Sequence, residues 1–263
     1  MNLAGQTALL SGASGGLGQA IARALAARGA TLTLTGRRAA VLEPLAAEVG
    51  GRVIVSDLAE ADAPARLLAE AGEVDVLVAN AGLPGSGRLS SFTPEEIDRA
   101  LDVNLRAPML LAHGLTEAMV ARGSGHLLFM SSLSGRAASP GTSVYAATKF
   151  GLRGFALSLR EDLAPKGVGV SVILPGFISD AGMFADSGAK LPPYVGTKRP
   201  EDVARAVVKA IESNRAELDV APLTLRAGAI LAGLAPGPVG AVQRRLGATK
   251  TADSIGKGQN DKR

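Results

Sequence analysis

The sequence predicts an α/β fold in which one parallel sheet is covered by helices on both faces. Short runs rich in Val, Leu and Ile alternate with Ala-rich segments of helical spacing along most of the 263 residues. The strand-like runs are continuously apolar, which is typical of strands that are buried on both faces. Right-handed crossovers between such strands give a doubly wound sheet of the Rossmann type, for which we expect about seven strands.

The elements follow one another in a regular order. Strands are expected at residues 7–11, 31–35, 52–56, 74–79, 126–131, 168–174 and 217–220. Helices are expected at residues 17–28, 38–49, 60–71, 94–122, 143–164 and 201–213. No linker rich in Pro, Gly or Ser interrupts this alternation before about residue 180, so we expect a single domain over residues 1–248.

Composition excludes several classes of protein. The chain has no cysteine, which rules out disulfides, thiolate metal sites and cysteine nucleophiles. Its net charge of +4 is modest, and we expect no nucleic-acid partner. The N-terminus shows no signal peptide, and the apolar stretch 227–235 is far shorter than the ~20 residues that span a bilayer. We therefore expect a cytoplasmic protein.

Two segments break the alternation of strands and helices. Residues 180–198 are rich in Gly, Pro and Ser and follow a strand end. We expect them to form a lid over the carboxyl edge of the sheet, where open α/β folds bind ligands. Residues 249–263 form a basic tail that we expect to be disordered.

Residues 223–247 form a C-terminal helical segment that mixes Ala, Leu, Ile and Val with Arg226, Arg244 and Arg245. Such a segment could lie on an anionic membrane surface. It could also pack on the substrate site or on a neighbouring subunit. We favour packing on protein, because apolar faces generally seek it.

A glycine-rich turn follows the first predicted strand and opens the first helix. Gly12, Gly16 and Gly18 permit a tight turn and the close approach of a pyrophosphate to the helix N-terminus. Ser14 and Leu17 belong to the same turn. Because it stands at the first strand of a βαβ series, the turn predicts a dinucleotide-binding site.

Residues 12–16 also fit G-x-S-x-G, the nucleophile elbow of α/β-hydrolases. A hydrolase triad needs an acid and then a histidine downstream, usually late in the chain. The two histidines, His113 and His126, lie in mid-chain. We interpret both as structural and favour the dinucleotide site.

Arg37 follows the end of the second predicted strand, at Gly36. An acidic residue near this point would bind the ribose 2′-hydroxyl of NAD, whereas an arginine accommodates the 2′-phosphate of NADP. The next acid, Glu43, falls inside the following helix. The sequence therefore favours NADP(H) over NAD(H), although Arg37 and Arg38 also suit an ordinary solvated helix start.

Tyr145 and Lys149 are four residues apart on a predicted helix, so they share one face. A nearby ammonium favours the ionised phenol and suits it to proton transfer. The bare pair would fit a solvated surface as well. Ser132, which ends an apolar run, adds a hydroxyl at the sheet edge, and the three residues together indicate carbonyl or alcohol redox chemistry.

The joint order of these motifs resembles that of the short-chain dehydrogenase/reductase family, from Ser11 to about Met183. The resemblance implies an oxidoreductase that binds a nicotinamide cofactor and assembles as a homodimer or homotetramer. The helices expected over 94–122 and 143–164 would form the subunit interface. Its substrate would be a small carbonyl compound or alcohol, and no metal is implied.

The resemblance also implies individual roles. Ser132 would hydrogen-bond the substrate oxygen, Tyr145 would pass the proton, and Lys149 would bind the nicotinamide ribose and lower the phenol pKa. Asn104 matches the helix asparagine that holds a water for proton relay, and Asp57 matches the acid that receives the adenine amino group. The implied cofactor contacts are Gly12, Ser14, Gly16, Leu17, Gly18, Arg37, Asp57, Leu58, Asn80, Ala81, Gly82, Tyr145, Lys149, Pro175, Gly176 and Ile178. The expected substrate contacts are Ser132, Leu133, Ser134, Tyr145, Phe177 and Met183, with Leu83 and Phe184 as further walls.

The chain departs from the family pattern after Ile178. Asp180 stands where the family commonly has Thr, and Met183 comes one place late. A carboxylate there would repel a pyrophosphate. We expect a shifted loop in which Ser179 or the backbone takes the threonine's role.

The leading hypothesis is an NADP(H)-dependent oxidoreductase that interconverts a carbonyl and an alcohol, with Tyr145 as general acid and base. The alternative is a protein on the same fold that binds NADP(H) as a structural or sensing ligand without turnover.

Overall fold

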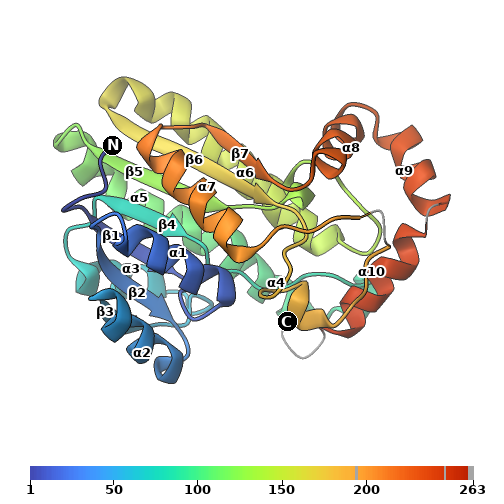
Figure 1. Cartoon of the computed structure of the whole chain (residues 1–263), viewed down its shortest axis with the longest axis horizontal. Coiled ribbons are helices and arrows are strands. Elements are labelled where there is room, and N and C mark those ends of the chain that lie inside the picture. Colours follow the sequence, from blue (N-terminus) through green and yellow to red (C-terminus); the bar gives the residue numbers. More distant parts are fainter. Residues whose placement is uncertain (193–194, 246, 260–263) are drawn as a thin grey trace.

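A computed structural model describes residues 1–192, 195–245 and 247–259. It contains one seven-stranded parallel sheet with the strand order β3-β2-β1-β4-β5-β6-β7 (Figure 1). The order reverses between β1 and β4, which opens a crevice at the carboxyl ends of these strands. The strands are β1 (Thr7–Ser11), β2 (Thr31–Gly36), β3 (Arg52–Val55), β4 (Val76–Ala79), β5 (Gly125–Met130), β6 (Val168–Pro175) and β7 (Glu217–Val220).

Helices cover both faces of the sheet, and each face has its own hydrophobic core. Alternate residues of β1 point to opposite faces, so Leu10 belongs to one core and Leu9 to the other. One core is closed by α1 (Gly16–Ala26), α2 (Ala39–Val49) and α7 (Pro200–Glu212). The other is closed by α3 (Ala63–Ala71), α5 (Ala107–Ala121) and α6 (Ser143–Leu163).

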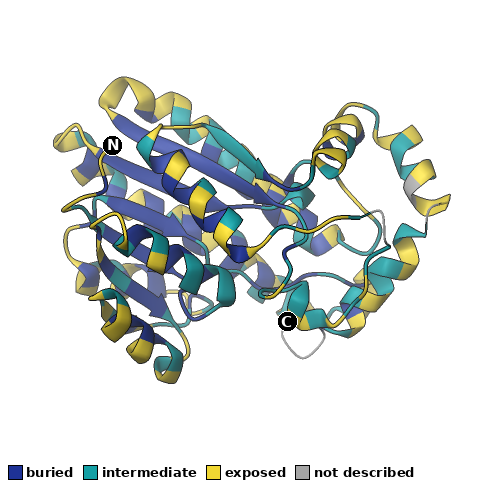
Figure 2. Ribbon diagram, viewed as in Figure 1, coloured by how far each residue is buried: buried dark blue, intermediate teal, exposed yellow. Residues whose placement is uncertain are grey.

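Burial supports this layered arrangement. The central strands are dark blue along most of their length in Figure 2, whereas the outer sides of the helices are exposed. Leu9, Leu10 and Phe129 are fully buried, and each such side chain stabilises the fold by about 1.5–3 kcal/mol. The predicted doubly wound α/β sheet with helices on both faces is confirmed.

The helix expected over residues 94–122 is interrupted. The helix α4 (Pro94–Leu101) begins with a capping box between Thr93 and Glu96, and a π-helical turn (Asp102–Arg106) separates it from α5. Pro108 has no N–H to donate to the carbonyl of Asn104, so the regular bond pattern cannot continue there. The turn sets the position of the Asn104 side chain.

Three further helices follow β7: α8 (Leu223–Leu234), α9 (Pro236–Arg245) and α10 (Ala248–Lys257). They lie beyond the carboxyl edge of the sheet, at the right of Figure 1. The prediction of a disordered tail from residue 249 was wrong for α10. This helix packs its Gly256 against the backbone of Gly87, and Arg88 pairs with Asp253 at 3.2 Å. The remaining tail residues, 260–263, and residues 193–194 of the expected lid lie outside the described residues, as does residue 246.

Candidate active site

A cavity of about 900 Å³ opens at the carboxyl end of the sheet. It is lined by the turns that follow β1, β2, β4, β5 and β6, and by parts of α6, α8 and α10. Of the expected cofactor contacts, all except Gly16 line it, and all the expected substrate contacts do. The structure thus brings residues that are far apart in the sequence to one cavity.

The glycine turn is shaped by close backbone approach. Gly12 has a left-handed φ of 66°, and a Cβ atom there would lie 2.7 Å from the Cα of Ala81. Asn80 donates through Nδ2 to the carbonyls of Ser11 at 3.1 Å and Gly12 at 3.2 Å. The end of β4 therefore holds the turn in place. Gly15, the N-cap of α1, offers no side-chain cap, so the first N–H groups of this helix suit an anion.

Ser11, where the family more often has Thr, performs a similar bracing role. Its Oγ accepts hydrogen bonds from the N–H groups of Asn80 at 3.1 Å and Ala81 at 3.0 Å. These bonds join β1 to the end of β4 beneath the turn. Together with the uncapped helix, they show that the residues present fit a dinucleotide pyrophosphate.

Two arginines follow the end of β2 beside the glycine turn. Arg38 donates to the Ser14 carbonyl at 2.6 Å, and Arg37 lies 3.8 Å from the Asp57 carboxylate. Both arginines line the cavity. Arg38 was not among the expected cofactor contacts, although its place beside Arg37 at the end of β2 could have indicated it.

Asp57 is held by a residue that the sequence did not reveal. Arg99, on α4, pairs with its carboxylate at 2.9 Å. Burial alone would raise the Asp57 pKa, but the hydrogen bonds from the Ala59 N–H and Arg99, with the charges of Arg99 and Arg37, outweigh burial and lower it. The carboxylate is therefore kept ionised and able to accept a hydrogen bond.

Ser132 lies at the end of β5 and opens a 3-10 turn (Leu133–Gly135). Its Oγ accepts a hydrogen bond from the Ser134 N–H at 3.1 Å and lies 3.4 Å from the Pro175 carbonyl. Ser132 also acts on the phenol of Tyr145, whose pKa it lowers through side-chain hydrogen bonding. The two hydroxyls thus face the same point of the cavity.

Lys149 lies one turn after Tyr145 on α6. Its Nζ donates to the Met130 carbonyl at 2.9 Å and lies 5.6 Å from the centroid of the Tyr145 ring. The lysine is 3% exposed, and burial lowers its pKa to about 8. The ammonium is thus fixed between β5 and the phenol rather than solvated.

The phenol pKa differs from the expectation. Burial raises the pKa of Tyr145 to about 12, and the hydrogen bond with Ser132 only partly offsets this effect. The expected lowering by Lys149 is not seen, because desolvation of the partly buried phenol and of the buried ammonium disfavours the charged form of both. Tyr145 is therefore a neutral phenol in this site and can donate a hydrogen bond.

Asn104 is fully buried in the π-helical turn and binds a backbone segment of the cavity wall. Its Oδ1 accepts from the Leu83 N–H at 2.6 Å, and its Nδ2 donates to the Leu83 carbonyl at 3.0 Å. A Cβ on Gly82 would lie 3.3 Å from Asn104 Oδ1 and 3.6 Å from Lys149 Nζ. Asn104 and Lys149 thus converge on the same glycine.

The substrate side of the cavity is mostly apolar. Phe177 packs edge-on against Phe184, with ring centroids 5.0 Å apart. Packing of residues 223–247 on the substrate site was one expectation from the sequence, and α8 does line the cavity. The wall that α10 contributes was not foreseen, because residues 249–263 were expected to be disordered. These additional lining residues are Thr224, Leu225, Gly228, Ala229, Ala248, Thr251, Ala252 and Ile255.

The lid segment turns sharply after Ile178. Asp180 adopts a left-handed φ of 66° and accepts a hydrogen bond from Ser179 Oγ at 2.9 Å. It lies outside the lining of the main cavity, in a smaller surface hollow beside Arg199. Ala181 packs on Gly16, so the lid lies directly on the glycine turn.

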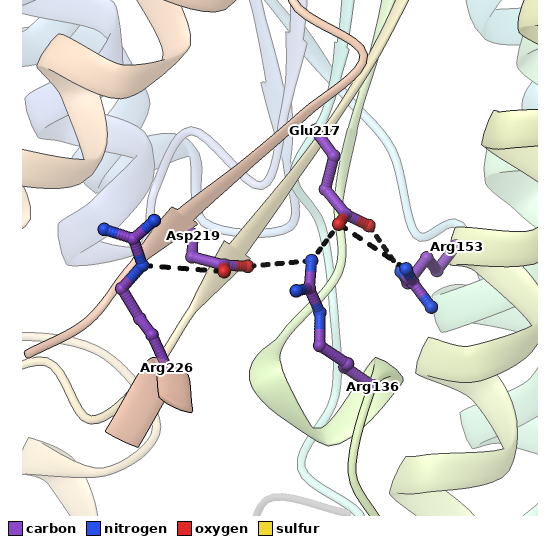
Figure 3. Close-up of polar contacts among 5 residues, drawn as sticks. All are labelled: Arg136, Arg153, Glu217, Asp219 and Arg226. Atoms are coloured by element: carbon purple, nitrogen blue, oxygen red, sulfur yellow. Dashed lines mark hydrogen bonds and ion pairs between the residues drawn. The ribbon is translucent and has the colours of Figure 1, made fainter. Parts of the chain in front are cut away.

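A chain of ion pairs supports the segment after Ser132 (Figure 3). Arg136 pairs with Glu217 and, at 3.2 Å, with Asp219, both on β7. Glu217 also pairs with Arg153 of α6, and Asp219 lies 3.6 Å from Arg226 of α8. The 3-10 turn after Ser132 is thereby connected to three elements of the fold.

The histidines do not form a hydrolase triad. His126 is buried near the start of β5, with Nε2 2.9 Å from Ser171 Oγ. Burial lowers its pKa to about 3. His113 is exposed on α5. Ser14 lies at the opposite, carboxyl end of the sheet, which excludes a nucleophile elbow served by His126.

Comparison with known proteins agrees with this geometry. The sequence model of the family described as "short chain dehydrogenase" matches residues 6–192. The ketoacyl reductase HetN of Nostoc sp. strain PCC 7120 is 37% identical over 227 residues, which cover 83% of this chain and 79% of HetN. The 3-oxoacyl-[acyl-carrier-protein] reductase FabG of Escherichia coli K12 is 38% identical over 184 residues, which cover 68% of this chain and 75% of FabG.

Solved structures show the same relationship. A short-chain dehydrogenase from Sphingobium yanoikuyae in complex with NADPH superposes with a TM-score of 0.77 at 26% identity, covering 92% of this chain and 95% of that one. The chain belongs to the short-chain dehydrogenase/reductase family.

Proposed function

We propose that this protein is an NADP(H)-dependent oxidoreductase that interconverts a carbonyl and an alcohol, with Tyr145 as general acid and base. The observation that carries the proposal is the shared cavity of Ser132, Tyr145, Lys149 and the glycine turn. A proton donor and an anion-binding helix end thus open on one volume. These are the parts that hydride transfer to a carbonyl needs from a protein.

The nicotinamide, when bound, supplies the hydride. Ser132 hydrogen-bonds the substrate oxygen, and Tyr145 donates its phenolic proton to that oxygen as negative charge develops there. Lys149 stabilises the phenolate that remains, because its ammonium lies one helical turn away. Asn104 holds the Leu83 backbone beside Lys149, and a water for proton relay would bind there.

Arg37 and Arg38 support a preference for NADP(H), because two guanidinium groups after β2, one on the Ser14 carbonyl and one near Asp57, suit a 2′-phosphate. The NADPH complex of the Sphingobium relative supports the same choice. Replacing Arg38 with Ala should raise KM for NADPH at least tenfold and change KM for NADH little. Equal changes in the KM values for NADPH and NADH would contradict a role of Arg38 in preferring NADP(H).

The apolar lining from α8 and α10 favours a carbonyl substrate with a sizeable apolar substituent. The names of HetN and FabG, both ketoacyl reductases, support the same substrate class.

Exposed Leu101, Met109 and Phe150, on α4, α5 and α6, support a homodimer or homotetramer that forms through these helices. A cytoplasmic location stays a prediction.

The test separates this proposal from a protein that binds NADP(H) without turnover. NADPH binding is measured by fluorescence, and its oxidation is followed across ketones and aldehydes of increasing apolar chain length. We expect binding together with turnover that improves with chain length. Tight binding without turnover on any of these substrates would instead favour the binding or sensing protein.

A further inference from the structure

The C-terminal helices carry an unusual share of the exposed apolar surface. Five of the ten exposed large hydrophobic side chains in the described part of the chain belong to α8 and α9. Leu223 and Leu234 are 77% and 80% exposed, more than any of the others. Figure 2 shows the outward side of α8 as mainly exposed.

The exposed residues of α8 share one helical face. Leu223, Ala227, Ile230, Leu231 and Leu234 are spaced by three or four residues and point to solvent. The opposite face of α8 lines the active-site cavity through Leu225, Gly228 and Ala229. A helix with apolar residues on two opposite faces requires an apolar environment on both of them, and the fold supplies it on only one.

The charge of this region indicates what covers the outer face. Between Asp219 and Asp253 the sequence contains Arg226, Arg244, Arg245 and Lys250 but no Asp or Glu. Arg226 is partly neutralised by Asp219 at 3.6 Å. Arg244, Arg245 and Lys250 are exposed and have no ion-pair partner among the residues that the structure describes. An exposed apolar face flanked by unpaired cations complements an anionic lipid surface.

A second copy of the chain fits this face less well. A two-fold contact brings the same patch of both copies together. It would set the cations of α9 and α10 against the same cations of the partner, with no acid in this segment to pair with them. The apolar side chains on α4, α5 and α6 offer a separate surface for assembly.

We propose that α8 and α9 lay this protein on an anionic membrane surface, with the apolar face of α8 in the interface and the cations of α9 on lipid headgroups. No helix within the described residues is long and apolar enough to cross a bilayer, and the proposed contact is peripheral. Because the other face of α8 lines the cavity, docking places a wall of the active site next to the lipid.

The test is co-sedimentation of the full chain, with NADPH present, with phosphatidylcholine vesicles that contain or lack phosphatidylglycerol. We expect binding to the anionic vesicles that weakens with salt. The double variant Leu231→Glu, Leu234→Glu should reduce the partition coefficient at least tenfold. The matched pair is Leu231→Glu alone and Val55→Glu on β3, because these two residues are 57% and 56% exposed and each variant adds one negative charge; Leu231→Glu should weaken binding and Val55→Glu should bind like the wild type.

A second variant tests the proposal independently, in case the leucine variant does not fold. Arg244→Gln, Arg245→Gln keeps the apolar face and should weaken binding roughly fivefold per arginine. Unchanged NADPH binding and melting temperature show that each variant is folded. Absence of wild-type binding to either vesicle, or equal binding to both, overturns the proposal. So does a fall in oligomer size by light scattering in the leucine variant without an effect on vesicle binding, which would assign the face to a second copy.

Discussion

The ammonium of Lys149 lies 5.6 Å from the centroid of the Tyr145 ring, one helical turn away on α6. Lys149 is buried and Tyr145 is partly buried, and desolvation moves their pKa values in opposite directions, to about 8 for Lys149 and about 12 for Tyr145. Tyr145 therefore keeps its proton over a wide pH range. As pH rises, Lys149 loses its charge before Tyr145 loses its proton, and that charge favours release of the proton.

The rate of carbonyl reduction should fall as pH rises through about 8, because Lys149 then loses its charge and Tyr145 becomes a weaker acid. We expect kcat/KM to decrease about tenfold per pH unit above this point. The profile is measured with saturating NADPH. In Lys149→Arg, whose guanidinium stays charged, any residual activity should lack this fall. A wild-type profile that is flat to pH 10 would contradict the role of Lys149.

The ion pairs of Arg136 should matter for both stability and turnover. Glu217→Gln leaves Arg136 and Arg153 with a neutral partner and should lower the free energy of unfolding by about 2–3 kcal/mol. The variant should also lower kcat while changing KM little. Arg136 ends the 3-10 turn that begins at Ser132, so loss of its ion pair should displace the Ser132 hydroxyl. Urea unfolding and steady-state kinetics measure the two effects.

The matched control for this variant is Glu48→Gln, which breaks the exposed pair with Arg23. An exposed pair contributes little to stability because solvent screens it, so both the free energy of unfolding and the kinetics should be nearly unchanged. If both variants behave alike, the ion pairs of Arg136 have no special role in placing Ser132.

Acid stability should depend on His126. Its pKa is about 3 in the folded chain and near 6.5 when unfolded, so the unfolded state binds the extra proton between these values. Stability is therefore expected to fall as pH drops through this window, by on the order of 5 kcal/mol in total. His126→Gln should remove that part of the pH dependence in denaturant titrations. Replacement of the exposed His113 by Gln should leave this pH dependence of stability unchanged. If both variants lose it equally, the pH dependence does not come from His126.

Much of the fold could be predicted, because parallel strands buried on both faces leave a strong pattern. The strand expected at residues 7–11 is β1, and the helix expected at 143–164 is α6. The break before α5 could also have been anticipated, since Pro108 cannot donate to Asn104. The spacing of Ala248, Ala252 and Ile255 is helical, so the sequence does indicate α10. The basic charge of residues 249–263 led instead to the prediction of a disordered tail.

Within the site, the residues near one another in sequence were the predictable ones. Tyr145 and Lys149 share a helix, and Ser132 ends a strand at the same sheet edge. Arg99 reaches Asp57 from another element, a contact that no local pattern encodes. The high pKa of Tyr145 also could not be foreseen, because it depends on burial by the assembled fold.

The most direct test of the account is hydride transfer from NADPH to a ketone by the wild type and by Tyr145→Phe, with NADPH affinity measured alongside. The variant removes only the phenolic hydroxyl, so turnover should fall about 10³-fold while NADPH affinity stays unchanged. Turnover close to the wild-type rate in the Phe variant would contradict Tyr145 as the proton donor.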